Sequence, residues 1–167
     1  MIFTVGHSNH SLEHYLQLLA AAHITAIADV RSRPHSRWAS QFDKHALGAE
    51  LGQNDVAYVF LGKELGGRPE DPALLKNGKP DYDAMSRAVS FRAGIDRIIE
   101  GAKTHRIALM CAERDPLDCH RFLLIGRHLA SRAIPVAHIL ASGEVEDQHK
   151  TEARFVARNP SGDLFSA

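Results

Sequence analysis

The chain of 167 residues contains only two cysteines, too few for the disulfide framework of a small secreted domain. No apolar run approaches the length that spans a bilayer, and no basic segment followed by an apolar one opens the chain. We therefore expect a cytoplasmic protein with reduced thiols and no membrane partner. Charge of one sign is not in excess either, because 20 Lys and Arg balance 20 Asp and Glu. Only a local basic patch could therefore recruit a polyanion.

Several motifs that would assign a common chemistry are missing. The glycine-rich segment 62–67 has the spacing of neither a Walker loop nor a dinucleotide-binding fingerprint. The sixth residues after Cys111 and Cys119 are Leu117 and Ile125, so the chain has no Cys-x5-Arg phosphatase loop. A recognisable rhodanese-type loop is absent as well. The sequence therefore supports neither a cysteine-dependent phosphatase nor a rhodanese-like sulfur carrier.

Short apolar runs alternate with amphipathic segments along the chain, which predicts an α/β fold with three layers. We expect a mostly parallel central sheet of about five strands, flanked by helices, in a single domain over residues 1–143. The expected strands are residues 2–5, 24–30, 56–61, 107–111 and 135–140. The expected helices follow Ser11, Asp43, Asp81 and Ser90, and a further one ends at Arg132.

Two segments depart from this alternation. Residues 69–81 are rich in Pro, Asp, Gly and Lys, which indicates an excursion over the surface that could act as a lid. Residues 144–167 form a charged C-terminal extension. Within it we expect residues 146–158 to be partly helical and residues 159–167 to be frayed.

The richest stretch covers residues 106–124, where a strand leads through a polar loop into a helix. Such a loop lies at the carboxyl edge of a parallel sheet, where α/β proteins bind their ligands. Cys119, Glu113 and His120 are candidate catalytic residues, with a thiol nucleophile and two groups able to move protons. Cys111, inside the apolar run, is more typical of a small buried hydrophobe.

Two different residues could cap the start of this helix. Asp115 can cap it with Pro116 in the first position, or Asp118 can cap it so that Cys119 falls in the first turn. Both place Cys119 near the positive end of the helix dipole, which would lower the pKa of its thiol.

Polar residues also follow the other strands. Arginine forks match the geometry of phosphates and carboxylates, and Asp29 at a strand end is a further candidate acid or base. The alternative to a ligand-binding role is a structural one. In that case the arginine-rich segment is a solvated loop in which Arg31 only pairs with Asp29, and the polar segments after the other strands are plain turns. The candidate ligand-binding residues are His7, Asn9, Arg31, Arg33, Arg37, Glu64, Arg68 and Arg121.

Since parallel strands end at one edge, these side chains should border a common pocket for an anion. Three functions remain open. The first is an enzyme acting on a phosphorylated or nucleotide-like substrate, and the second is a non-catalytic module that binds a nucleotide or nucleic acid. The third is a metal protein using His7, His10, Cys119 or His120. No cofactor is indicated, and no metal-ligand set is assigned, because Cys-x7-Cys-His matches no known zinc knuckle.

Several motifs together resemble the family called domain of unknown function 488, from about Phe3 to Leu140. The resemblance implies a compact α/β domain of bacteria and archaea, but no activity. The motifs are Val5-Gly6-His7-Ser8, Asp29-Val30-Arg31 with Pro34 and Arg37, Leu61-Gly62 with Leu65-Gly66-Gly67-Arg68, and Cys111-Ala112-Glu113 with Asp115-Pro116 and Cys119-His120-Arg121.

Overall fold

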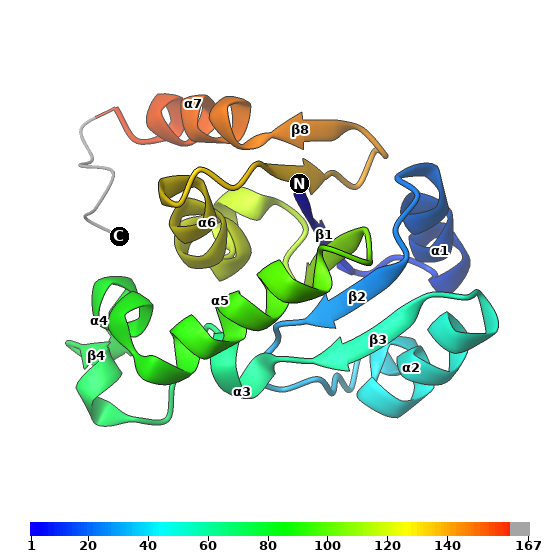
Figure 1. Ribbon diagram of the computed structural model, residues 1–167, viewed down its shortest axis with the longest axis horizontal. Helices are drawn as coiled ribbons and strands as arrows, with labels where there is room; N and C mark the ends of the chain where they lie inside the picture. Colours follow the sequence, from blue (N-terminus) through cyan, green and yellow to red (C-terminus); the bar gives the residue numbers. More distant parts are fainter. Residues whose placement is uncertain (161–167) are drawn as a thin grey trace.

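A computed structural model describes residues 1–160 of the chain (Figure 1). Its central sheet has the strand order β3-β2-β6-β1-β7-β8, and the first five strands of this order run parallel. Strand β8 pairs antiparallel with β7 at one edge. The strands are β1 (Ile2–Gly6), β2 (Ala26–Asp29), β3 (Ala57–Phe60), β6 (Ile107–Cys111), β7 (Val136–Ile139) and β8 (Val145–Asp147).

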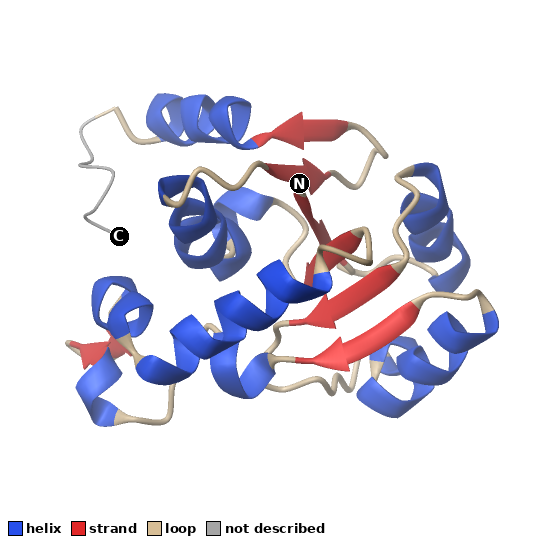
Figure 2. Ribbon diagram, viewed as in Figure 1, coloured by secondary structure: helices blue, strands red, loops and turns tan. Residues whose placement is uncertain are grey.

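Helices cover both faces of the sheet and complete the three-layer α/β architecture (Figure 2). One face carries α1 (Leu12–Ala21) and α2 (Lys44–Gln53). The other carries α3 (Gly62–Leu65), α4 (Tyr82–Arg87), α5 (Val89–Gly101), the π-helix η4 (Arg121–Gly126) and α6 (Arg127–Ser131). The last helix, α7 (Gln148–Arg158), follows β8 directly.

Alternation along the strands sorts the core into two parts. In β6, Ile107 and Leu109 face the α5 side, whereas Ala108 and Met110 face the α1 side. Both faces of the strand are covered, so β6 is apolar throughout and buried along its whole length. The chemistry of such a strand is therefore confined to its last residue, Cys111, and to the loop that follows.

The mostly parallel α/β fold is confirmed, and the structure adds detail to several elements. The helix expected after Ser90 begins two residues earlier, at Val89, with Ala88 and not Ser90 in the capping position. Residues 69–81 contain the short helix η2 (Pro72–Leu74) and a hairpin of β4 (Leu75–Lys76) and β5 (Lys79–Pro80). Ser11 caps its helix through its side chain as expected, and Asp81 caps α4 in the same way.

The segment after Gly143 contributes to the sheet and to the packing beside it. The predicted helix over 146–158 is confirmed by α7, but the strand β8 was not expected. Arg154 of α7 pairs with Asp115 at 3.1 Å and with Glu146 at 2.9 Å. Residues 161–167, where fraying was expected, lie outside the described part of the chain. No helix in residues 1–160 is long and apolar enough to cross a membrane.

His138 in β7 is fully buried and its hydrogen bonds fix a neutral ring. Its Nε2 lies 3.0 Å from Gln148 Oε1, so it donates, and its Nδ1 accepts from the hydroxyl of Thr4 at 2.8 Å. Burial lowers the pKa of His138 to about 4.

Because this pKa lies below the unfolded value of about 6.5, stability from His138 is complete above pH 6.5 and is lost as pH falls toward 4. We expect wild type to lose about 2 kcal/mol of unfolding free energy from this group between pH 7 and pH 5. Urea unfolding at both pH values, compared with H138Q, measures the contribution. The same pH dependence in H138Q, or an NMR titration of His138 near pH 6.5, would contradict it.

Candidate active site

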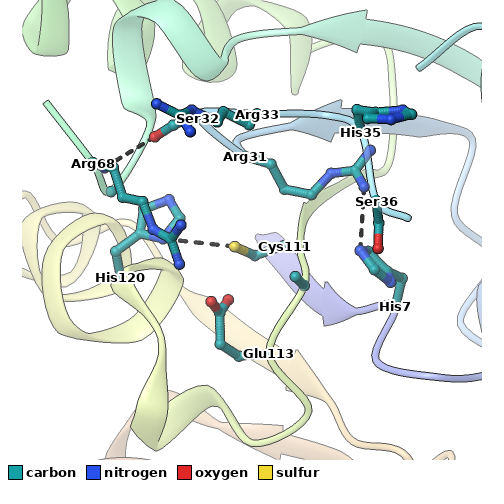
Figure 3. A pocket seen from close by; sticks show the side chains of 12 residues that line it. His7, Arg31, Ser32, Arg33, His35, Ser36, Arg68, Cys111, Glu113 and His120 are labelled. Atoms are coloured by element: carbon teal, nitrogen blue, oxygen red, sulfur yellow. Dashed lines mark hydrogen bonds between the residues drawn. The ribbon is translucent and has the colours of Figure 1, made fainter. Parts of the chain in front are cut away.

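The carboxyl ends of β1, β2 and β6 border a cavity of about 270 Å³. Figure 3 shows Arg31 and His7 on one side, His120 and Arg68 on the opposite side, and the carboxylate of Glu113 directed between them. Strand β6 lies between β1 and β2 in the sheet, so three segments that are distant in sequence meet here. The lining residues are His7, Arg31, Ser32, Arg33, His35, Ser36, Gly67, Arg68, Cys111, Ala112, Glu113 and His120.

Arg31 is held rigidly at the cavity wall by Asp29. The Asp29 carboxylate accepts hydrogen bonds from Arg31 Nε at 2.9 Å and from Nη2 at 2.7 Å, and Tyr58 donates to the same carboxylate at 2.7 Å. Arg31 Nη2 also donates to the carbonyl of Phe42 at 2.7 Å. Asp29 therefore neutralises and orients Arg31, and Nη1 is left to face the cavity.

His7 supports Arg31 from the end of β1. Its Nδ1 donates to the carbonyl of Ser8 at 2.8 Å, so its Nε2 is free to accept from Arg31 Nη1 at 3.2 Å. Burial and the nearby charge of Arg31 lower the pKa of His7 to about 4. The ring, stacked on Phe42, is thus a neutral acceptor at pH 7.

The mouth of the cavity is basic. Arg33 and Arg68 are exposed, and no carboxylate among residues 1–160 forms an ion pair with either guanidinium. The backbone of Arg68 is fixed by a hydrogen bond from its N–H to Ser32 Oγ at 2.9 Å. His35, also at the mouth, contacts the carboxylate of Asp43 at 2.5 Å. Two unpaired positive charges therefore stand over a concave polar surface.

The floor of the cavity holds a compact group of ionisable side chains, called here the Cys-Glu-His cluster: Cys111, Glu113, Cys119 and His120. Their possible ligand atoms all lie within 4.8 Å of one another. Cys119 Sγ is 3.0 Å from Glu113 Oε2, and His120 Nδ1 is 3.6 Å from Cys111 Sγ and 3.7 Å from Cys119 Sγ. Both thiols are free and buried.

The two thiols and the carboxyl group of the cluster differ in how readily they ionise. Burial opposes ionisation of Cys119, but hydrogen bonds from Cys111 and His120 and the charge of Arg121 outweigh it and lower the pKa of this thiol. The hydrogen bond to Cys119, together with burial, raises the pKa of Cys111. Glu113 is also buried, yet its hydrogen bonds from the two thiols lower the pKa of its carboxyl. The cluster therefore concentrates negative charge beneath the basic mouth.

Asp115 caps the short helix η3 (Pro116–Asp118), with its carboxylate accepting from Leu117 N–H at 3.0 Å. The next helical segment starts at Cys119, whose carbonyl accepts from the N–H groups of Phe122 and Leu123. Cys119 Sγ accepts from the backbone N–H of Arg121 at 3.4 Å. Cys119 is thus in the role of an N-cap, outside the first turn, and the helix that follows begins as a π-helix.

Two close contacts fix the cluster against the rest of the site. Buried Arg121 donates to the carbonyls of Glu113 at 2.6 Å and Arg114 at 3.0 Å, which holds the loop after β6. A Cβ on Gly67 would lie 2.6 Å from the ring of His120. Glycine is therefore required where the loop after α3 passes over this imidazole.

The structure places the predicted site residues in four different positions. His7, Arg31, Arg33, Arg68, Glu113 and His120 line the cavity. Asp29, Cys119 and Arg121 lie behind its wall, whereas Asn9 and Arg37 are exposed outside it. Glu64 pairs with Arg97 at 2.5 Å in a neighbouring cavity of about 530 Å³, which shares Ser32 and Arg68 with the first.

Sequence reasoning missed part of the lining. Cys111, expected to be only a core residue, borders the cavity, and so do Ser32, His35 and Ser36. The available signal for Cys111 was its position as the last residue of the strand, next to Ala112 and Glu113. The side chains at such a strand end face the ligand edge whether or not they are apolar.

A sequence model of the family described as Domain of unknown function DUF488 matches residues 11–127. No curated protein and no solved structure shows significant similarity to the chain.

Proposed function

From the premise that the chain belongs to the DUF488 family, whose description assigns no activity, we propose an enzyme that acts on a small anionic substrate bound in the cavity at the carboxyl edge of the sheet. The substrate class is a phosphate ester or a nucleotide. The observation that carries the proposal is the placement of two unpaired guanidiniums, Arg33 and Arg68, above the Cys-Glu-His cluster.

The arrangement suits a phosphoryl oxygen better than a neutral ligand. Arg31 offers a fixed donor at the wall, and Arg33 and Arg68 offer mobile donors at the mouth. Charge-assisted hydrogen bonds of this kind are about twice as strong as neutral ones. The volume of about 270 Å³ fits a compact group and not an extended apolar one.

Glu113 is the best candidate for proton transfer to or from the substrate. It is half-buried, it lines the cavity, and its carboxylate is directed into the open space (Figure 3). Cys119, the nucleophile expected from the sequence, is 2% exposed and does not border the cavity. The geometry therefore favours Glu113 as the acid or base and Cys119 as a group that holds Glu113 in place.

The binding half of this proposal is tested by calorimetric titration with inorganic phosphate and a series of nucleoside monophosphates. We expect R68A and R33A each to weaken binding about 10-fold to 100-fold, because each removes one charge-assisted contact. R92A on α5 is the matched control, since Arg92 is exposed and lies outside the cavity. Equal affinity of R68A and wild type for every anion would reject the proposal.

The catalytic half needs a separate measurement. E113Q is expected to keep anion binding and to lose turnover in a screen of phosphate esters, because the amide cannot exchange a proton. Unchanged turnover in E113Q would remove Glu113 from the chemistry.

A nucleic-acid ligand is the second candidate, and the exposed Trp38 favours it. This side chain is 91% exposed and follows Arg37 on the loop that also carries Arg33. An indole beside arginines offers a stacking face for a base. Affinity for single-stranded DNA that falls steeply with salt, and falls further in W38A, would support this candidate over a small substrate.

A further inference from the structure

The Cys-Glu-His cluster brings two sulfurs, a carboxylate and an imidazole into one small volume, with ligand atoms within 4.8 Å of one another. A separation of 3.0 Å between Cys119 Sγ and Glu113 Oε2 requires a proton or a cation between them, because two anions at that distance repel. Cys111 adds a second sulfur to the same small volume. His120 Nδ1 faces both sulfurs as well, so a cation that displaced the shared protons would contact all four ligand atoms at once.

We propose that Cys111, Cys119 and His120 bind a zinc ion at the floor of the cavity, with Glu113 as the fourth, exchangeable ligand. This inference stands independently of the anion substrate proposed above. Thiolate and imidazole are the ligands that zinc prefers in tetrahedral sites.

The two distances from the imidazole to the sulfurs agree with a tetrahedron around one ion. With Zn–S near 2.3 Å and Zn–N near 2.0 Å, a tetrahedral angle separates sulfur from nitrogen by about 3.5 Å. His120 Nδ1 lies 3.6 Å from one sulfur and 3.7 Å from the other. The Glu113 edge, at 3.0 Å, is shorter, and this carboxylate borders open space into which it can move.

The imidazole is already oriented as in zinc sites. His120 Nε2 lies 3.1 Å from the carbonyl of Val30 and donates to it, because a carbonyl only accepts. Nδ1 faces the two sulfurs, so an ion that displaced the proton from Nδ1 would be bound without any rotation of the ring. A backbone carbonyl behind a metal-bound histidine fixes the tautomer and raises the basicity of the ligand. Gly67, packed on the ring, prevents it from turning away.

The ligands differ in their access to the cavity, which suggests what the ion does. Cys111, Cys119 and His120 are 4%, 2% and 7% exposed, whereas Glu113 is half-buried. Three buried ligands and one replaceable ligand are typical of catalytic zinc sites, which keep a position for water or substrate. An ion here would present that position to the space beneath Arg33 and Arg68, where it could polarise an oxygen of a bound anion.

The sequence offered Cys119 and His120 as possible metal ligands but not Cys111 or Glu113, because the spacing matches no zinc knuckle. The ligands come from the end of β6, from the loop after it and from the start of the next helical segment. Their proximity depends on η3, which folds the chain back so that Cys119 lies beside Cys111 and Glu113.

The test uses untagged full-length protein, stripped with a chelator under reducing conditions and titrated with Co²⁺ as a spectroscopic probe. We expect one Co²⁺ per chain, tetrahedral ligand-field bands and a thiolate-to-cobalt charge-transfer band, with Zn²⁺ displacing Co²⁺. C111S and C119S should each halve the charge-transfer intensity and weaken binding at least about 100-fold, since loss of a mere outer-shell partner costs 10-fold to 100-fold. H105Q replaces an exposed histidine that lies outside the cavity, and this variant should bind the ion as wild type does.

Because serine is close in size to cysteine, we expect the serine variants to fold. Circular dichroism of each variant without metal shows whether it is folded. The inference fails if folded wild-type apoprotein binds Co²⁺ or Zn²⁺ with a Kd above about 1 μM. It also fails if the cobalt spectrum lacks the thiolate band, or if the C111S/C119S double variant retains the ion.

Phosphate titrations of the apo and zinc-loaded protein separate this inference from the proposed function. Zinc binding without any anion binding overturns only the proposed function. Anion binding that depends on Arg68 in a protein that binds no metal overturns only the zinc site.

Discussion

Replacing Asp29 by alanine is expected to lower the free energy of unfolding by about 3–5 kcal/mol. Asp29 is fully buried, and Arg31 beside it is only 5% exposed. The substitution removes the sole carboxylate within residues 1–160 that pairs with Arg31, and it leaves the charge of Arg31 in a poorly solvated place. The hydroxyl of Tyr58 loses its acceptor as well. Urea unfolding at pH 7 measures the change.

Two further variants distinguish the ion pair from other causes. Y58F removes one hydrogen bond and is expected to cost about 1 kcal/mol. The double variant D29A/R31M removes both charges together, so it should be more stable than D29A alone. A loss below 1 kcal/mol in D29A, or no recovery in the double variant, would show that Arg31 does not depend on Asp29.

This pair also shows where sequence reasoning about the site stops. Asp29 and Arg31 follow one strand, and both were candidates for direct contact with a ligand. The structure turns Arg31 into the cavity and Asp29 behind it, because Tyr58 on the neighbouring strand and the carbonyl of Phe42 complete their hydrogen bonds. Those partners are distant in sequence, so no local pattern could assign the two roles.

The parallel sheet was predictable because the signal is local. Each of β1, β2, β6 and β7 is a short apolar run that is buried along its length. Parallel pairing then places the polar residues after β1, β2 and β6 at one edge, and the structure brings His7, Arg31 and Glu113 together around one cavity.

Strand β8 escaped prediction because its pattern is inverted. Its one buried residue is Glu146, whereas Val145 is 45% exposed. Glu146 is tolerated inside because Thr151 and Arg154 both donate to its carboxylate, at 2.6 and 2.9 Å. A method that looks for apolar residues on the inner face cannot find a strand whose inner residue is a carboxylate satisfied by the following helix.

Replacing Arg121 by methionine is the second substitution from which we expect a large loss of unfolding free energy. It was a candidate ligand for an anion, but it is fully buried and donates to the carbonyls of Glu113 and Arg114. R121M fills similar space and removes a buried charge, which is favourable, but it leaves two carbonyls without their donor. Each unsatisfied group costs about 1–3 kcal/mol, so we expect a net loss of about 3 kcal/mol in urea unfolding.

The position of Arg121 predicts a second effect that a merely less stable protein would not show. Without its clamp, the loop that carries Glu113 separates from the start of η4, and both thiols become accessible. In the absence of urea, where R121M is still folded, we expect a thiol reagent to modify Cys111 and Cys119 faster than in wild type. We also expect R121M to bind phosphate more weakly than wild type does. R132M is the matched control, because Arg132 forms only an exposed ion pair with Asp96 and its loss should change stability by less than about 1 kcal/mol. Wild-type stability together with wild-type thiol protection in R121M would mean that the loop after β6 is held by its backbone contacts with β1, where Gly6 already lies against the carbonyl of Glu113.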